Sequence, residues 1–417
     1  MHTSVPDRSR RAVVTGLGVV APNGIGTEAW WQATVAGTSG IRRISRFDPS
    51  RYATQFAGEV SGFEPTDFLE RRMIVQTDRW TWMGLAAAQM ALDDAALDPA
   101  AHDPYGMSVV TASSSGGNEF GQVEIEKLWG RGPGFVGAYQ SIAWFYAATT
   151  GQISIRHGMK GSSSVVASEG AGGLEALAHS RRTIRRGTRA IVSGGVEAPL
   201  SPYALSCQLA NGRMSTVAGA EAYRPFDARA SGYLPGEGGA VLLVEDLEHA
   251  RERDAPQIYG EIAGYGATND ACHATGLPET PRQLTRAMTI ALDDAGVHPD
   301  EVDAVFADGA GTPAGDALEV QAIRAVFGGR ARDVPVTVPK SMVGRLYAGG
   351  AALDVAGALL AMRDGHLPPT INLDRAANGG GLDVVTGTGR DADLRTVLVI
   401  ARGYGGFNAA LVVRRID

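Results

Sequence analysis

Residues 165–177 read Val165-Val-Ala-Ser-Glu-Gly-Ala-Gly-Gly-Leu-Glu-Ala-Leu177, a pattern that predicts a strand turning sharply into a helix. The first two residues are apolar and β-branched, as at the end of a strand, and Leu174 and Leu177 fall at helical spacing after a glycine-rich turn. The turn places Gly170 at the helix N-terminus, where free backbone N–H groups and the helix dipole favour negative charge. Many enzymes carry a nucleophile at such an elbow, but this chain has no side chain there.

Composition limits the class of protein. The chain has 417 residues, 44% hydrophobic and 20% charged, and can therefore bury a large core. A net charge of −7 gives no support to a nucleic-acid partner. Two cysteines exclude a disulfide scaffold and make a reducing cytoplasm the expected compartment. No apolar run is long enough to span a membrane, and we expect neither a metal nor a cofactor.

The sequence contains an internal repeat. Ala91–Pro99 (Ala-Leu-Asp-Asp-Ala-Ala-Leu-Asp-Pro) recurs as Ala291–Pro299 (Ala-Leu-Asp-Asp-Ala-Gly-Val-His-Pro). Both copies follow an Ala-rich helical segment and lead into an expected strand, at Met107–Ala112 and at Val302–Asp308. A match of this length could arise by chance, but the shared helix–loop–strand context favours duplication.

Duplication predicts one compact α/β unit built from two similar halves, residues 11–250 and 251–417. Each half should hold a mostly parallel sheet between layers of helices. Residues 1–10 contain no hydrophobic signal-peptide region, and we expect them to form a short disordered leader.

Six separated motifs, in order along the chain, resemble those of the β-ketoacyl synthase family. They are Val13–Pro22, Arg224–Asp227, Pro235–Ala240, Asp308–Pro313, Lys340–Gly344 and Gly403–Asn408. The resemblance covers residues 11–415. It implies the thiolase fold, an α/β architecture of duplicated five-layer αβαβα type, which agrees with the internal repeat.

The resemblance also implies a catalytic set that this chain lacks. The family needs a cysteine thiolate at the elbow to carry the acyl chain, and two histidines that assist decarboxylation of the malonyl extender and stabilise the oxyanion. Gly170 stands at the cysteine position, Asp308 and Arg345 stand at the two histidine positions, and Lys340 is kept. We therefore expect no catalytic residue. We expect Asp308 and Arg345 to form an ion pair that fills this degenerate site, and Gly170 to leave a small void, or space for water or a ligand.

This pattern of loss resembles the chain length factor, the β subunit of type II polyketide β-ketoacyl synthases. The motifs that carry this resemblance are Trp144–Ala147, Thr150–Ile153, Glu169–Leu174 and Gly344–Tyr347. The usual elbow residue of that subfamily is glutamine, so glycine is a departure. The resemblance implies a non-catalytic chain in an acyltransferase heterodimer of antibiotic biosynthesis. There it helps to set chain length during iterative decarboxylative Claisen condensation of malonyl units on an acyl carrier protein.

The partners implied are an active ketosynthase α subunit, the acyl carrier protein and the growing polyketide chain. The interface is expected at the strand before the elbow, namely Ser163, Ser164, Val165, Val166 and Ala167. The polyketide tunnel is expected to be lined by Asn118, Gly121 and Ile125, with Tyr203 or Leu205 from a later segment. Because the first two tunnel positions are small, the resemblance implies a longer or differently shaped tunnel.

Two other functions are considered. The chain could be a malonyl-thioester decarboxylase or acyltransferase that uses Lys340 or Glu169, or a homodimeric binding protein for acyl chains. The loss of the cysteine and both histidines argues against an independent enzyme.

Several side chains have an ordinary structural interpretation that we favour. Cys207 is expected to be a small core residue. Ser168 and Glu169 could contact a ligand, but hydrogen bonds to the backbone of the turn are favoured. The arginines at positions 181, 182, 185, 186 and 189 could dock an acidic carrier protein, although a solvated helix end is the favoured interpretation.

Overall fold

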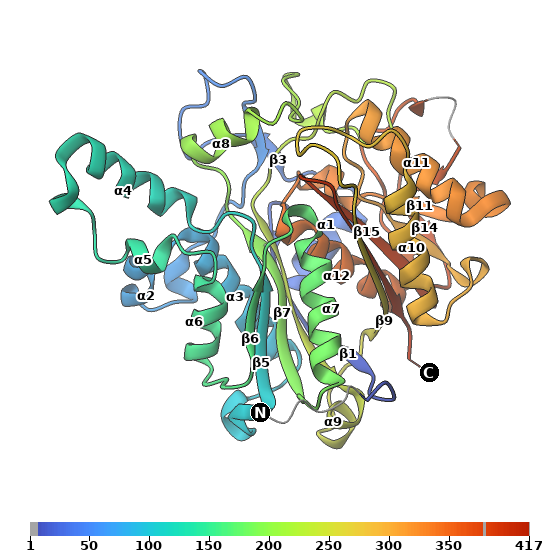
Figure 1. Cartoon of the computed structure of the whole chain (residues 1–417), viewed down its shortest axis with the longest axis horizontal. Helices are drawn as coiled ribbons and strands as arrows, with labels where there is room; N and C mark the ends of the chain where they lie inside the picture. The colour runs from blue at the N-terminus through green and yellow to red at the C-terminus, as the bar shows by residue number, and fades with distance from the viewer. Residues whose placement is uncertain (1–6, 378–380, 417) are drawn as a thin grey trace.

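The two halves of the chain contribute strands in the same order to one twelve-stranded sheet. The structure is a computed structural model that describes residues 7–377 and 381–416 (Figure 1). The first half has the order β1 (Ala12–Ala21), β8 (Gly238–Asp246), β7 (Ala190–Glu197), β5 (Met107–Ala112) and β6 (Ser163–Val166). The second half has the order β9 (Gly260–Asn269), β16 (Phe407–Arg414), β15 (Thr396–Gly403), β10 (Ala304–Phe306) and β11 (Pro335–Thr337), followed by β13 (Asp383–Val384). The twelfth strand, β2 (Gly24–Ile25), pairs with β1 outside this order.

Strand direction repeats as well as strand order. The strand that follows each sequence repeat, β5 or β10, pairs in parallel with both of its neighbours. The next two pairings in each half are antiparallel. The two half-sheets meet where β1 pairs with β9 at Val13 and Val14. Equal order and equal direction confirm the predicted duplication.

Helices form three layers around the two half-sheets. The central layer holds α7 (Gly172–Ile184) and α12 (Ala348–Asp364), which pack on each other. Residues 348–362 are all buried, as expected for a helix that is apolar on every side. The outer layers are α3 (Arg79–Asp94) with α6 (Ala148–Arg156), and α10 (Arg282–Ala295) with α11 (Pro313–Phe327). The predicted five-layer αβαβα arrangement is therefore confirmed.

Two glycines of β1 allow α3 to pack directly against the backbone of this strand. A Cβ atom added to Gly16 would collide with the carbonyl oxygen of Ala91, and one added to Gly18 would collide with the carbonyl oxygen of Ala87. Both alanines are fully buried. The strand and the helix therefore approach at backbone distance, which leaves no room for a methyl group.

The second half repeats this contact between β9 and α10. Gly264 faces the carbonyl oxygen of Ala291, and Gly266 faces that of Ala287. The sequence repeat begins at Ala91 and Ala291, which are two of these contact residues. A steric requirement for small residues explains why this part of the duplicated sequence stayed recognisable.

The remaining elements are short or lie at the periphery. They are the helices α1 (Thr27–Val35), α2 (Arg71–Gln76), α4 (Asn118–Arg131), α5 (Gln140–Ala143), α8 (Pro202–Leu209) and α9 (Leu247–Glu252), and the strands β2 (Gly24–Ile25), β3 (Ile41–Arg43), β4 (Phe56–Gly58), β12 (His366–Leu367) and β14 (Arg390–Asp391). Figure 1 shows α4 reaching outward from the body, with α5 beneath it. Among the described helices, none has the length and apolar character needed to cross a bilayer.

Positions 1–6 of the expected leader, residues 1–10, lie outside the described residues. Residues 7–10 contact the body of the protein. The backbone N–H of Asp7 donates to the carbonyl oxygen of Arg185 at 2.7 Å, and Arg10 forms an ion pair with Asp246 at 3.4 Å. For residues 7–10 the expectation of disorder is therefore wrong.

The glycine contact predicts a steep steric cost. We expect Gly18→Ala to lower the free energy of unfolding by about 2 kcal/mol, because the added methyl group overpacks the contact between β1 and α3. Gly151→Ala is the matched control, since it lies in α6 with no atom near its Cβ direction and should be neutral or slightly stabilising. Denaturant unfolding of both variants checks this, and equal midpoints would contradict it.

Candidate functional site

The elbow forms as the sequence predicts, but its glycine is tightly enclosed. β6 ends at Val166, a single turn of 3₁₀ helix spans Glu169–Ala171, and α7 follows. A Cβ atom on Gly170 would collide with the carbonyl oxygen of Arg402 and would lie 3.0 Å from Nη2 of Arg345. A space of about 10 Å³ remains next to it, close to what one water molecule needs. The expected small void is therefore present, but it has no room for a larger ligand.

Both side chains of the predicted ion pair line this small space. Asp308 follows β10 and Arg345 precedes α12, and the two side chains meet with both N···O distances at 3.2 Å. Arg345 also donates to the carbonyl oxygen of Arg402, and the N–H of Arg402 donates to Asp308 at 2.9 Å. The ion pair is confirmed, and it is buried. Sequence reasoning missed Arg402, although it directly precedes a recognised glycine motif.

Electrostatics keep this pair charged. Burial alone would raise the pKa of Asp308. The positive charges of Arg345 and Lys340, together with the N–H of Arg402, outweigh burial and hold the pKa of Asp308 below its usual range. A charged, bidentate pair therefore occupies the place where the family resemblance expects two histidines.

Lys340 is committed to a second buried contact. Its Nζ atom donates to the carboxylate of Asp354 and, at 3.0 Å, to the carbonyl oxygen of Ala307. Burial raises the pKa of Asp354 to about 6, and Lys340 opposes that rise. With its donors engaged and its side chain 4% exposed, Lys340 is not presented as a nucleophile.

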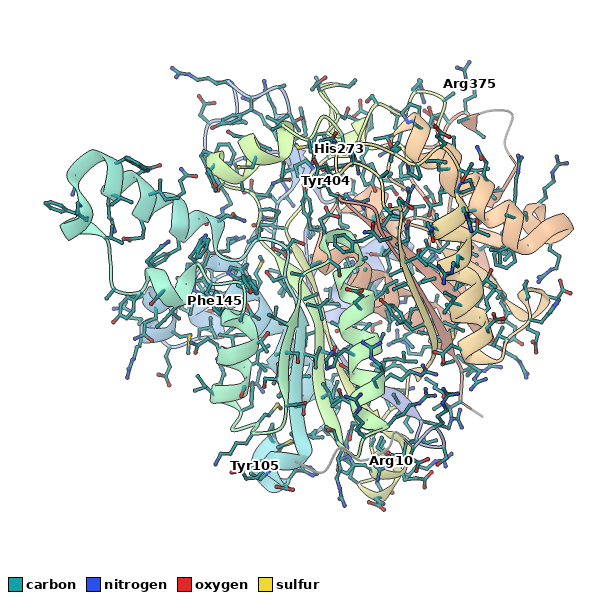
Figure 2. The ribbon with its side chains drawn as sticks, viewed as in Figure 1. Arg10, Tyr105, Phe145, His273, Arg375 and Tyr404 are labelled. Carbon is teal, nitrogen blue, oxygen red and sulfur yellow. The ribbon has the colours of Figure 1, made fainter. Side chains whose placement is uncertain are left out.

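A cavity of about 380 Å³ lies beside the elbow. The charged residues that line it are Glu169, Arg213, Asp270, Asp308, Arg345 and Arg402. Tyr404 also lines it, and Figure 2 labels Tyr404 in the upper part of the molecule. Neither a cysteine nor a histidine is found among the described residues of its lining. The cavity thus holds neither a thiol nor an imidazole for acyl transfer.

Glu169 behaves as its favoured interpretation predicts, because its carboxylate accepts from backbone N–H groups. Ser168 differs from the prediction, since its hydroxyl donates to the side chain of Glu175 and not to the backbone. Two other expectations are wrong. Cys207 is exposed on α8 because the apolar side of this short helix is occupied by Ala204 and Leu205. Arg181 is buried, where it bonds Asp294 and the carbonyl oxygen of Ala263.

The predicted tunnel residues are split between the surface and the interior. Ile125 and Tyr203 are 39% and 49% exposed, whereas Asn118 and Leu205 are buried. Gly121 is also buried, and a Cβ atom there would lie 2.7 Å from the Trp144 ring. Leu205 joins an interior cluster with Ile41 and Tyr223. Of the two residues from the later segment, Tyr203 is exposed and its N–H donates to Gln122 on α4, whereas Leu205 points into the interior.

The predicted interface strand is an open edge. Within the described residues, β6 ends the sheet and pairs only with β5. Ser163 and Ala167 are exposed, and Ser164, Val165 and Val166 are half-buried. We define the apolar arm as residues 118–147, which hold α4, α5 and the segments between α4 and α6. Its exposed apolar side chains are Val123, Ile125, Leu128, Trp129, Phe135, Tyr139, Ile142, Trp144, Phe145 and Tyr146. Figure 2 shows Phe145 on this flank.

Comparison with known proteins decides the family. The model of the β-ketoacyl synthase N-terminal domain matches residues 9–250, and that of the C-terminal domain matches residues 259–374. The chain belongs to the β-ketoacyl synthase family. It is 55% identical, over 97% of its own length and 98% of the relative's, to the tetracenomycin polyketide synthase ketoacyl synthase beta subunit of Streptomyces glaucescens. The predicted resemblance to β subunits is thereby confirmed.

Solved structures agree with this assignment. The ishigamide ketosynthase/chain length factor superposes with a TM-score of 0.91 at 30% identity, covering 98% of this chain and all of the other. The second structure is a type II polyketide synthase acyl-carrier protein in complex with its ketosynthase, bound to the hexaketide. The matched chain of this complex superposes with a TM-score of 0.89 at 28% identity, covering 99% of this chain and all of the other. The thiolase fold of these synthases is therefore the fold of this chain.

The buried ion pair predicts a large loss on removing one partner. We expect Asp308→Ala to lower the free energy of unfolding by about 3–5 kcal/mol, because Arg345 is left buried without its counter-charge. Arg251→Ala is the control: it breaks an exposed pair with Glu248 and should cost below about 1 kcal/mol. Thermal melts compare the two, and a neutral Asp308→Ala would show that the pair is not what closes the site.

Proposed function

We propose that this chain is the chain-length-determining β subunit of a type II polyketide ketosynthase and performs no acyl transfer itself. One observation carries the proposal: the elbow of a β-ketoacyl synthase fold bears Gly170, and the adjacent space is filled by the Asp308–Arg345 pair. A thiol at this elbow would need the space that Arg402 and Arg345 occupy. The condensing cysteine must then come from a ketosynthase α subunit.

Two surfaces support pairing with that subunit. The open edge of β6 offers unpaired backbone groups that a second chain can bond. The apolar arm offers side chains that a monomer would leave in water, and contiguous exposed apolar surface of this kind marks protein–protein contacts. We propose that β6, from Ser163 to Ala167, and the arm together form the heterodimer interface.

The arm also provides the surface that would shape the polyketide tunnel. Ile125 on α4 and Tyr203 on α8 are exposed, and the N–H of Tyr203 bonds the side chain of Gln122 on α4 at 2.9 Å. Asn118 and Gly121 are buried, and Gly121 lies against the ring of Trp144. We propose that Ile125 and Tyr203 contact the growing chain carried by the acyl carrier protein, and that Gly121 sets the position of Trp144.

The structure gives no support to the alternative of an independent decarboxylase or acyltransferase. Lys340 is buried in its contact with Asp354, and one oxygen of Glu169 is held by two backbone N–H groups. Lys340 is therefore not presented to a thioester, and one carboxylate oxygen of Glu169 is already engaged in the elbow.

Intact-mass spectrometry tests the division of labour. The chain is co-purified with a cysteine-bearing ketosynthase and incubated with an acyl carrier protein loaded with a starter acyl group. We expect the acyl mass increment on the partner alone, since this chain offers no thiolate at its elbow. An increment on this chain would overturn the proposal, because it would reveal a nucleophile.

The tunnel assignment predicts a change of product length. We expect Ile125→Trp to shorten the main polyketide by at least one two-carbon unit, because the larger side chain fills space that the growing chain needs. Ile155→Trp is the control: it places a tryptophan at an exposed position of α6 and should leave the product length unchanged. Gly121→Phe should act in the same direction by displacing Trp144. Mass analysis of the products checks all three, and unchanged length in the first would exclude the assignment.

A further inference from the structure

One carboxylate caps two helices at the base of the apolar arm. Asp78 is the N-cap of α3, and its Oδ1 atom accepts from the N–H of Trp80 at 3.1 Å. Its Oδ2 atom accepts from the N–H of Phe120, in the first turn of α4, at 2.8 Å. Asp78 is 2% exposed. The N-termini of the two helices therefore share one buried negative charge, which both helix dipoles favour.

α4 has no room for a cap of its own. Its N-cap is Gly117, which has no side chain. A Cβ atom at Gly117 would collide with the carbonyl oxygen of Ala143 and with the Cβ atom of Asp78. A serine, threonine or aspartate, the residues that usually cap a helix, therefore does not fit at this position. The cap has to come from another element, and Asp78 provides it.

Packing within this chain does little to fix α4 on the body of the protein. The helix has 14 residues, and its buried residues are Asn118, Gly121 and Glu124. Gly121 lies against Trp144, and Glu124 accepts from the N–H of Gly137, so both of these contacts stay inside the arm. The orientation of α4 on the body therefore depends strongly on the contacts of its first turn.

The charge of Asp78 depends on the same two helices. Burial raises the pKa of Asp78 to about 6, and Glu119 on α4 adds to that rise. The N–H groups of Phe120 and Trp80, together with the positive charge of Arg46, oppose it. Asp78 is therefore mainly ionised at neutral pH, and an ionised carboxylate can accept from both helices at once.

We propose that Asp78 is the residue that positions α4, and with it the tunnel side chain Ile125, for the control of polyketide length. It acts through α4 and touches neither the thioester nor the growing chain. The inference rests on the proposed function and deepens it, because it names the contact that fixes the tunnel wall to the body. Without this cap α4 adopts more than one orientation, and the growing chain is stopped at less uniform lengths.

Asp78→Ser separates the two caps. A serine hydroxyl is a good N-cap for its own helix, α3, but its single oxygen atom cannot also reach α4. We expect this variant to raise the share of polyketides that differ from the main length about fivefold, which is the change in an equilibrium that loss of one cap produces. Mass analysis of the products checks this, with the variant co-purified with a cysteine-bearing ketosynthase and supplied with malonyl-loaded acyl carrier protein.

Asp246→Ala is the matched control. Asp246 is the N-cap of α9, where it accepts from the N–H of Glu248 at 3.0 Å, and Figure 1 shows α9 at the lower end of the molecule, away from α4. This variant should lower Tm and leave the product lengths unchanged. Asp78→Ala uncaps both α3 and α4, so it should lower Tm more than Asp78→Ser does and spread the product lengths to the same degree. Asp78→Ser keeps the test decisive if the alanine variant folds poorly.

The outcomes separate this inference from the proposed function. Natural product lengths in Asp78→Ser would overturn the inference, and so would an equal spread of lengths in Asp246→Ala, since the effect would then follow stability. A change of length in Ile125→Trp but not in Asp78→Ser would overturn the inference and leave the proposed function intact. No change in either variant would overturn both.

Discussion

The buried ion pair between Asp308 and Arg345 is the contact on which the elbow depends. Its guanidinium lies where a side chain at position 170 would lie, so the pair and the glycine require each other. Arg402 joins them by accepting from Arg345 and donating to Asp308. Since Gly170 comes from the first half of the chain and the other three from the second, the close approach at Gly170 is also a contact between the halves. Loss of catalytic chemistry here is accompanied by a close-packed polar replacement at the elbow itself, next to a cavity of about 380 Å³.

Duplication explains why such precise packing survives in a chain with so much glycine. Each half uses two glycines in its first strand to let an outer helix approach at backbone distance. Each central helix is preceded by a residue with a left-handed backbone, Glu169 before α7 and Tyr347 before α12. The halves differ in what those residues do. The Tyr347 hydroxyl bonds Gln208 on α8, whereas Glu169 turns inward onto the elbow itself.

The interior and the surface of this subunit have different roles. Its former site is closed by charges that neutralise each other inside the fold. Its exposed edge strand and apolar arm are the features that remain incomplete in a single chain. A fold that buries a polar site and exposes apolar side chains suits a subunit whose function lies in an assembly, since contiguous apolar surface is stabilised only when a partner removes it from water.

The sequence by itself determined the architecture and the identity of the missing catalytic groups. Local patterns predicted the elbow and the duplication, because a strand–turn–helix pattern and a repeated helix–loop–strand unit are encoded by residues close together in the chain. The family resemblance implied the thiolase fold and the catalytic positions, and the opposite charges at two of those positions led to the Asp308–Arg345 pair. Only the tertiary structure decided how small the space beside Gly170 is, that Cys207 faces solvent while Arg181 is buried, and that Glu169 bonds Tyr404. Each of these depends on segments far apart in sequence, and the space between such segments is set by packing, which no local pattern records.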